Sequence, residues 1–137
     1  MSVFQWPVRV YYEDTDSGGV VYYANYLRFM ERARTEWMRA LGFEQDRLIR
    51  EEGIVFAVRS ANVEFLQPAR FNDLLTVSTR LQQRGRASLT FAHSIGRQTE
   101  ESRPCCTGEV KVACVNANTF RPQPIPETLM KEIADVD

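Results

Sequence analysis

Residues 8–41 place an extended segment, an acidic turn and a long amphipathic stretch in direct succession, and this order limits the folds that the chain can adopt. Val8–Tyr12 is rich in valine and tyrosine, which suits a β-strand. Residues 14–19 read Asp-Thr-Asp-Ser-Gly-Gly, and these residue types bond their own backbone or accept positive φ, as tight turns require. We therefore expect a strand that ends in a tight turn carrying two carboxylates, Asp14 and Asp16.

The segment after this turn has the apolar spacing of an α-helix. Asn25 is expected to cap its N-terminus, and Gly42 to end it, because glycine accepts the left-handed conformation found beyond helix C-termini. Apolar side chains recur at three- and four-residue steps and so share one helical face, namely Tyr22, Tyr26, Phe29, Met30, Ala33, Trp37 and Leu41. This face needs a partner to cover it.

The remaining chain supplies that partner as antiparallel strands. One long helix against one antiparallel sheet is an α+β two-layer domain, which we expect residues 1–137 to form as a single unit. The core is expected to hold Tyr22, Tyr26, Phe29, Trp37 and the strand valines. Open sheet edges also favour self-association. The periodicity predicts strands over Ile54–Leu66, Leu75–Gln82, Ser88–Ile95 and Cys106–Cys114, and helices over Glu44–Glu52 and Glu127–Ala134.

The composition is that of a soluble globular protein, since 44% of the 137 residues are hydrophobic and 26% are charged. Lys and Arg number 17 against 18 Asp and Glu, so a broad basic surface for nucleic acid is not expected. The N-terminus lacks the pattern of a signal peptide, and no apolar run is long enough to cross a membrane. With three cysteines and no sign of export, we expect a cytoplasmic protein with reduced thiols.

Asp16 is the first candidate for chemistry. One interpretation is a turn aspartate whose side chain bonds a nearby amide, which is the usual role before a helix. The other is a catalytic carboxylate, since Asp14 alone accounts for the turn. Gly18 and Gly19 let a ligand approach the backbone closely, and the positive end of the long helix follows. A carboxylate beside free helical amides suits acyl transfer, because the amides can polarise a carbonyl group.

Other reactive residues give weaker signals. His93 is the only histidine and falls on the apolar face of its strand, which favours a buried structural role over a catalytic triad or a metal site. Glu31 and Glu36 are expected to form solvated ion pairs with arginines of the same helix, with Glu31 kept as a second candidate. The cysteines lack metal-type spacing, so buried, inert thiols are expected. No metal or other cofactor is predicted.

Arg84, Arg86 and Ser88 form a compact basic cluster at a predicted hairpin tip. A solvated tip is the simpler interpretation. Two guanidinium groups beside a glycine and a hydroxyl also suit a polyphosphate group. The chain has no P-loop and no Gly-x-Gly-x-x-Gly pattern, so a nucleotide site of those kinds is not predicted.

The turn and the helix together resemble the YbgC-type acyl-CoA thioesterases, which are associated with the Tol–Pal system and belong to the 4-hydroxybenzoyl-CoA thioesterase family. The similarity covers nearly the whole chain. The residues that carry it are Tyr11–Tyr22, Asn25-Tyr26, Glu31–Glu36, Val63–Phe65, Pro68–Arg70 and Asp73.

The resemblance implies a hotdog fold, in which a curved antiparallel sheet wraps a long central helix, and assembly into dimers or tetramers. It implies hydrolysis of acyl-CoA thioesters, with Asp16 as nucleophile or general base and the backbone N–H of Tyr23 polarising the carbonyl. Gly19 would lie at the substrate, and partners in lipid synthesis, including acyl carriers, are also implied. By the same analogy, a site between two subunits would bind the CoA phosphates through Arg84, Arg86 and Ser88.

One residue departs from the family pattern. YbgC-type members commonly carry histidine seven residues after the catalytic aspartate, where this chain has Tyr23, as the 4-hydroxybenzoyl branch does. A tyrosine with an ordinary pKa near ~10 is no base at neutral pH, so a mechanism built on an Asp–His pair is not expected. Two alternatives stay open at this point. One is an enoyl-thioester hydratase, which would usually need such a pair, and the other is a non-catalytic hotdog that docks envelope or lipid-synthesis proteins.

Overall fold

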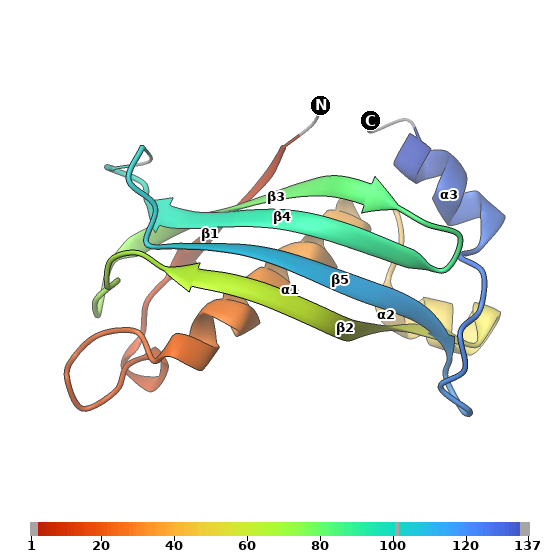
Figure 1. The fold of residues 1–137 in the computed structure, drawn as a ribbon, viewed down its shortest axis with the longest axis horizontal. Helices are drawn as coiled ribbons and strands as arrows, with labels where there is room; N and C mark the ends of the chain where they lie inside the picture. Colours follow the sequence, from red (N-terminus) through yellow and green to blue (C-terminus); the bar gives the residue numbers. More distant parts are fainter. Residues whose placement is uncertain (1–2, 101, 135–137) are drawn as a thin grey trace.

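A five-stranded antiparallel sheet and one long helix dominate the computed structural model, which describes residues 3–100 and 102–134. The strands lie in the order β1-β3-β4-β5-β2. The helix α1, Tyr23–Ala40, crosses one face of the curved sheet (Figure 1). This confirms the predicted α+β two-layer architecture. The strands are β1 Phe4–Arg9, β2 Ile54–Phe65, β3 Leu74–Arg84, β4 Ser88–Arg97 and β5 Cys106–Asn116.

Shorter helical segments gather at the end of the sheet where α1 finishes. The helix α2, Gln45–Arg47, runs into a π-helical turn, η2, over Leu48–Glu52. The helix α3, Glu127–Ala134, lies beside the loop that joins β3 to β4 (Figure 1). The Ile125 N–H donates to the carbonyl of Arg86 at 2.9 Å and so ties the proline-rich segment before α3 to that loop.

The core lies between α1 and the inner face of the sheet. Trp37 of α1 meets Phe91 of β4 edge to face, with ring centroids 5.1 Å apart. The strand β3 buries every second residue from Leu75 to Leu81, as the sequence alternation predicts, whereas β2 buries only Ile54. Burying each large apolar side chain of this kind contributes roughly 1.5–3 kcal/mol to folding. The largest enclosed members include Phe29, Met30, Leu75, Val77, Leu89, Phe91, Ile95 and Val110.

The predictions at the start of α1 are wrong in two details. Tyr22, which the spacing places in the core, is 45% exposed and precedes the helix as its N-cap residue. Asn25 is no cap, because the helix begins at Tyr23 and buries Asn25 in its first turn. The first strand is also displaced, since β1 ends at Arg9 and residues 12–14 form a 3-10 turn.

The strand β2 forms one edge of the sheet and pairs only with β5. Its register slips between Val58 and Ser60, and from Val58 onward most of its side chains are exposed. Val58 and Phe65 are 57% and 52% exposed, respectively. An edge strand that presents free backbone groups and apolar side chains is suited to pairing with another strand.

Candidate active site

Backbone hydrogen bonds hold the acidic turn in one shape. Asp16 donates its N–H to the carbonyl of Val20 at 2.9 Å, and Gly19 donates to the carbonyl of Asp16 at 3.0 Å. The Asp16 carboxylate accepts from the N–H of Gly18 at 2.8 Å. Gly19 has a φ of 78°, which glycine adopts without strain. The turn therefore holds the Asp16 carboxylate in place while leaving that residue exposed.

Asp14 has the opposite environment, because it is buried. Its carboxylate accepts from the side-chain amide of Asn25 at 2.8 Å and from the N–H of Tyr11 at 2.9 Å. Its carbonyl accepts the N–H of Tyr22 at 2.8 Å. Asp14 thus joins the turn to the start of α1, which leaves only Asp16 of the two carboxylates open to a ligand.

The N-terminus of α1 brings free backbone donors to the same loop. Tyr23 is the first residue of the helix, and no acceptor among residues 3–100 and 102–134 receives its N–H. The helix dipole adds partial positive charge at this point. Thr15 and Val21 form a β-bridge that keeps the turn closed just before the helix begins. One short loop therefore presents a carboxylate and an uncommitted hydrogen-bond donor.

Aromatic rings form an apolar wall beside these donors. The ring of Tyr23 meets that of Phe65, at the end of β2, edge to face with centroids 6.1 Å apart. Phe65 also lies 5.8 Å from the ring of Tyr26. A hydrogen bond with Tyr23 raises the pKa of the Tyr22 hydroxyl. Tyr23 and Phe65 remain 61% and 52% exposed, so this wall is accessible to an apolar ligand or to another chain.

The loop between β2 and β3 supports the turn from the other side. Val21 donates its N–H to the carbonyl of Ala69 at 2.8 Å, and Val20 forms a β-bridge with Arg70. Tyr26 accepts the N–H of Ala69 on its hydroxyl at 3.1 Å. The segment Pro68–Arg70, which the sequence resemblance includes, therefore buttresses the loop that carries Asp16.

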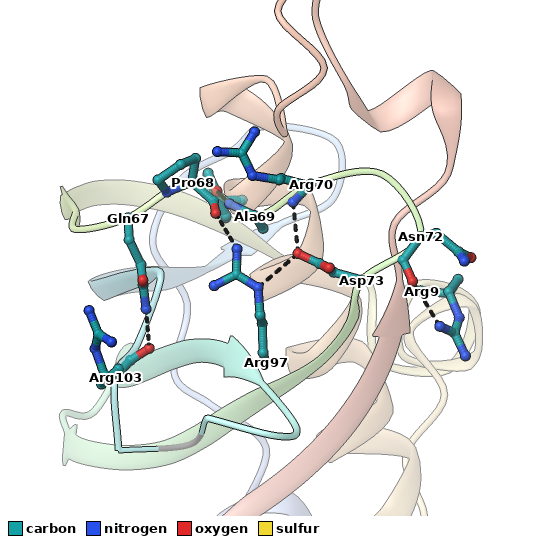
Figure 2. Close-up of polar contacts among 10 residues, drawn as sticks. Arg9, Gln67, Pro68, Ala69, Arg70, Asn72, Asp73, Arg97 and Arg103 are labelled. Atoms are coloured by element: carbon teal, nitrogen blue, oxygen red, sulfur yellow. Dashed lines mark hydrogen bonds and ion pairs between the residues drawn. The ribbon is translucent and has the colours of Figure 1, made fainter.

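Arg97 of β4 holds this supporting loop in place, and sequence reasoning missed it. Figure 2 shows its guanidinium reaching two parts of the loop, the carboxylate of Asp73 and the carbonyl of Pro68. The bond from Nε to Asp73 measures 2.9 Å, and the same carboxylate accepts the N–H of Arg70 at 2.9 Å. In the sequence, Asp73 stands out only as one of the residues that carry the family resemblance, and nothing there marks Arg97 as its partner.

The basic cluster lies far from the turn within one chain. Arg84 ends β3, and Ser88 begins β4 at the opposite end of the sheet from the Asp16 loop (Figure 1). The start of β3, by contrast, follows the loop that supports Asp16. The strand rise of ~3.3 Å per residue places the two ends of β3 on the order of 30 Å apart. A single chain therefore does not bring Asp16 together with Arg84, Arg86 and Ser88.

His93 is buried, as expected, but it belongs to a polar network. Its Nε2 lies 3.1 Å from Nη1 of Arg34, and its Nδ1 lies 3.1 Å from Oγ1 of Thr79. A guanidinium can only donate, so Nε2 accepts from Arg34 and Nδ1 donates to Thr79. Burial, aided by the Arg34 charge, lowers the pKa of His93 to about 3. The sole histidine is thus neutral and forms no pair with Asp16.

Arg34 contradicts the expected ion pairing on α1. Glu31 and Glu36 were expected to form solvated ion pairs with arginines of this helix, yet Arg34, which is one of those arginines, is buried beneath the sheet and turns its side chain to His93. Glu36 pairs with Arg39 instead, and Glu31 is exposed and accepts from the Thr35 hydroxyl at 2.8 Å. Arg34 lies four residues after Met30 and three before Trp37, so the helical spacing places it beside the apolar face, but its charge favoured a solvated position.

The cysteines show no sign of reactivity. Cys105, Cys106 and Cys114 are all buried as free thiols. Burial raises the pKa of Cys106 to about 12 and that of Cys114 to about 11, so neither is a thiolate at neutral pH. Within the described ranges, no cluster of three or more His, Cys, Asp or Glu side chains is arranged to hold a metal ion. In the same ranges no helix is long and apolar enough to span a membrane.

Asn25→Asp tests the contact that anchors the turn. The substitution removes the donor to Asp14 and places two carboxylates within hydrogen-bond distance, so one must hold a proton. We expect the free energy of unfolding at pH 7.5 to fall by about 1–3 kcal/mol and to recover in part as the pH decreases. Chemical denaturation at several pH values measures this. Asn25→Ala is the control, since its loss should depend less on pH, and equal pH profiles would contradict the assignment.

Comparison with known proteins places the chain in a family. The model of the thioesterase-like superfamily matches residues 10–133. The chain is 42% identical over 131 residues to the acyl-CoA thioester hydrolase YbgC of Escherichia coli O6:H1, covering 96% of each protein. It is 42% identical over 124 residues to the acyl-CoA thioesterase YbgC of Haemophilus influenzae, covering 90% of this chain and 89% of that protein.

Solved structures agree on the fold. The structure of Slr0204, a 1,4-dihydroxy-2-naphthoyl-CoA thioesterase from Synechocystis, superimposes with a TM-score of 0.89 at 21% identity, over 99% of this chain and 98% of that one. The long helix α1 on a five-stranded antiparallel sheet is therefore the hotdog fold that the sequence resemblance implied. Both the extent of the family match and the identity to the YbgC proteins show that the chain belongs to the thioesterase-like superfamily.

Proposed function

We propose that this chain hydrolyses acyl-CoA thioesters to a carboxylic acid and free CoA, with Asp16 as the reacting carboxylate. The observation that carries the proposal is an exposed Asp16 on a hydrogen-bonded turn that leads directly into the N-terminus of α1. The relatives at 42% identity, which are named acyl-CoA thioester hydrolase and acyl-CoA thioesterase, support the substrate class.

The proposed chemistry divides between Asp16 and the Tyr23 backbone. The N–H of Tyr23 donates to the thioester carbonyl oxygen and stabilises the negative charge that develops there. If Asp16 is the general base, it takes a proton from water, the water oxygen adds to the carbonyl carbon, and the C–S bond breaks. The departing CoA thiolate then takes up the proton that Asp16 removed from water, which restores the Asp16 carboxylate. Gly19 contributes by allowing the substrate to approach the turn closely.

The nucleophilic variant differs in its first bond. A carboxylate oxygen of Asp16 attacks the carbonyl carbon and displaces the thiolate, giving a mixed anhydride that water then hydrolyses. Rapid quenching during a single turnover, followed by mass spectrometry of the Asp16 peptide, separates the two routes. A peptide heavier by one acyl group indicates the nucleophile, and an unmodified peptide at every time point indicates the general base.

The phosphate site is proposed to come from a second copy of the chain. A two-fold axis through antiparallel β2 strands reverses one copy end for end. The hairpin tip of one chain then lies at the end of the sheet that carries Asp16 of the other. The exposed edge of β2 and the exposed Phe65 support such pairing. Each dimer would thus hold two sites, each built from both chains.

A thiol-release assay over acyl-CoAs of different chain length, both aliphatic and aromatic, tests the activity. The proposal expects saturable release of CoA that is lost in the Asp16→Asn variant. Wild-type protein that releases no thiol above background from any member of the panel would contradict it. Such a result would favour the non-catalytic docking role instead. The hydratase alternative loses support from the structure, since His93 is committed to Arg34 and Thr79.

Removing the arginines at the hairpin tip should weaken CoA binding more than chemistry. For the Arg84→Ala, Arg86→Ala double variant we expect KM for acyl-CoA to rise about 10-fold or more, as each charge-assisted bond to phosphate is worth ~1.5–3 kcal/mol. Steady-state kinetics on acyl-CoA and on the matching acyl-pantetheine, which lacks the nucleotide, measure the effect. An equal rise in KM for both substrates would contradict a phosphate role.

Mixing the Asp16 variant with the hairpin-tip variant tests whether the site is shared. Co-expressed Asp16→Asn and Arg84→Ala, Arg86→Ala chains should regain activity at low acyl-CoA concentration, because a mixed dimer keeps one unaltered site. Each variant alone is the matched control. No gain over the sum of the two separate variants would show that one chain supplies both parts, and would contradict the shared site.

A further inference from the structure

A small cavity lies under the sheet, along α1 and away from the Asp16 turn. It measures about 80 Å³. Its walls are mostly apolar, with Met38 of α1 facing Phe56, Leu89, Phe91 and Val112 of the sheet. The charged side chains at its lining are Arg34 and Glu31.

Arg34 is the unusual member of this lining. It is only 8% exposed, and its Nη1 donates to His93 at 3.1 Å. None of the described carboxylates lies within ion-pair distance of it, and its charged neighbour is Glu31, which acts on it through space and raises its pKa. The charge persists at neutral pH, because burial lowers the pKa of Arg34 only to about 10.

The remaining nitrogens of Arg34 face open space in the cavity. They make no hydrogen bond to residues 3–100 and 102–134. In those same ranges, no side-chain nitrogen or oxygen is both enclosed and without a partner, so these nitrogens are reached from the cavity. His93 and Thr79 stand behind Nη1 and fix the direction of the guanidinium. The donors are therefore held in place and uncommitted.

We propose that this cavity, here called the Arg34 cavity, binds the carboxylate group of a short aliphatic acid. A carboxylate accepts two parallel N–H bonds from one guanidinium and supplies a negative charge in direct contact with it, which Glu31 does not. The apolar walls accommodate the few methylene groups behind it. Glu31 opposes an anion from the rim, but it is exposed and bonded to Thr35, so solvent screens its charge.

Two sources offer the same chemistry. One is the far end of an ω-carboxyacyl group on the thioester, which would make Arg34 a specificity determinant. Arg34 lies 11 residues beyond Tyr23, and the helical rise of ~1.5 Å per residue separates them by about 16 Å along α1. The other source is a free acid, including the product of hydrolysis. The first rests on the proposed function, whereas carboxylate binding itself does not.

His93 gives a direct readout of binding, because it is the only histidine in the chain. We expect titration of the wild-type protein with butyrate to shift the His93 ring ¹⁵N resonances saturably, since the carboxylate polarises the Arg34 guanidinium that bonds Nε2. Butyramide has the same shape without the charge, so the concentration needed for a half-maximal shift should be at least ~10-fold higher than for butyrate. No saturable shift with butyrate, or equal shifts with both compounds, would overturn the proposal.

Variants sharpen this test. Arg34→Met should abolish butyrate binding. Arg28 is an exposed arginine six residues earlier on α1, and Arg28→Met should leave butyrate binding unchanged. Glu31→Gln should tighten binding, because it removes the opposing charge at the rim. The Glu31 variant alters only an exposed side chain, so it keeps the test valid if Arg34→Met does not fold. Weaker butyrate binding in Glu31→Gln would contradict the proposed position of the anion.

Kinetics distinguish the two sources. An ω-carboxyacyl substrate predicts that kcat/KM for dodecanedioyl-CoA, whose chain is long enough to span the separation of Tyr23 from Arg34, exceeds that for dodecanoyl-CoA, and that Arg34→Met reverses the order. A free-acid site predicts no such preference but inhibition by butyrate that Arg34→Met relieves. If the protein binds butyrate but hydrolyses no acyl-CoA, the proposed function is wrong and the proposal of carboxylate binding in the Arg34 cavity is unaffected. If the protein hydrolyses acyl-CoA but shows no preference for the ω-carboxyacyl substrate, no inhibition by butyrate and no butyrate binding, only the proposal of carboxylate binding in the Arg34 cavity is wrong.

Discussion

The Asp16→Asn variant is expected to hydrolyse acyl-CoA with a kcat roughly 10²–10⁴-fold below that of the wild type, as is usual when a positioned acid–base group is lost. The substitution is well suited to the test, because the asparagine oxygen can still accept the N–H of Gly18. The residue is exposed, so the fold should be unaffected. Steady-state kinetics with a thiol-release assay, together with thermal unfolding, measure both expectations.

Asp14→Asn is the matched control for the same turn. Asp14 accepts from Asn25 and from Tyr11, so its loss should lower the free energy of unfolding by about 1–3 kcal/mol. Any effect on kcat should follow the loss of structure. Wild-type rates in Asp16→Asn, or a larger fall in kcat in Asp14→Asn at temperatures where both are folded, would reverse the roles assigned to the two carboxylates.

Periodicity predicts the strands well, because side chains alternate between the two faces of a sheet and only one face packs on the helix. The alternation over Leu75–Gln82 and Ser88–Ile95 reappears as buried inward and less buried outward residues. The start of α1 was harder to predict. Local rules favoured Asn25 as a cap, but a buried bond to Asp14, 11 residues earlier, sets its position instead. Contacts of this range are not visible in local spacing, so the helix boundary was misplaced.

The site likewise has parts that the sequence predicts and parts that it does not. The acidic turn, its glycine and the helix that follows are contiguous in sequence, so they could be found before the structure. Arg97 and Arg34 could not, because each acts on residues from other elements. Arg97 reaches the loop before β3, and Arg34 reaches His93 on β4. The distance in space between Arg84 and Asp16 also could not be predicted from the sequence, because it depends on how the strands are arranged in the sheet.

His93 should make the stability of the protein depend on pH between about 3 and 6.5. Its pKa is about 3 in the folded chain against 6.5 for the free side chain, so the unfolded state binds more protons within that window. Protonation therefore favours unfolding, and stability decreases as the pH falls from the higher value to the lower. Linkage gives a loss of about 2 kcal/mol between pH 7.5 and pH 5 from this residue. Urea denaturation at each pH measures it.

His93→Gln provides the control that isolates the cause. A glutamine can accept from Arg34 and donate to Thr79, as the neutral imidazole does, but it does not titrate. The variant should retain its stability from pH 7.5 down to pH 5, where the carboxylates of the unfolded chain are still mostly ionised. If the free energy of unfolding has the same pH dependence in wild type and variant, His93 takes up its proton in the folded state. The cavity side of the network would then be more open to water than the burial of His93 indicates.

The same two proteins also give a test of ligand binding. Because Arg34 keeps its charge across this range, a carboxylate bound to it should stabilise both proteins at pH 7.5 to a similar extent.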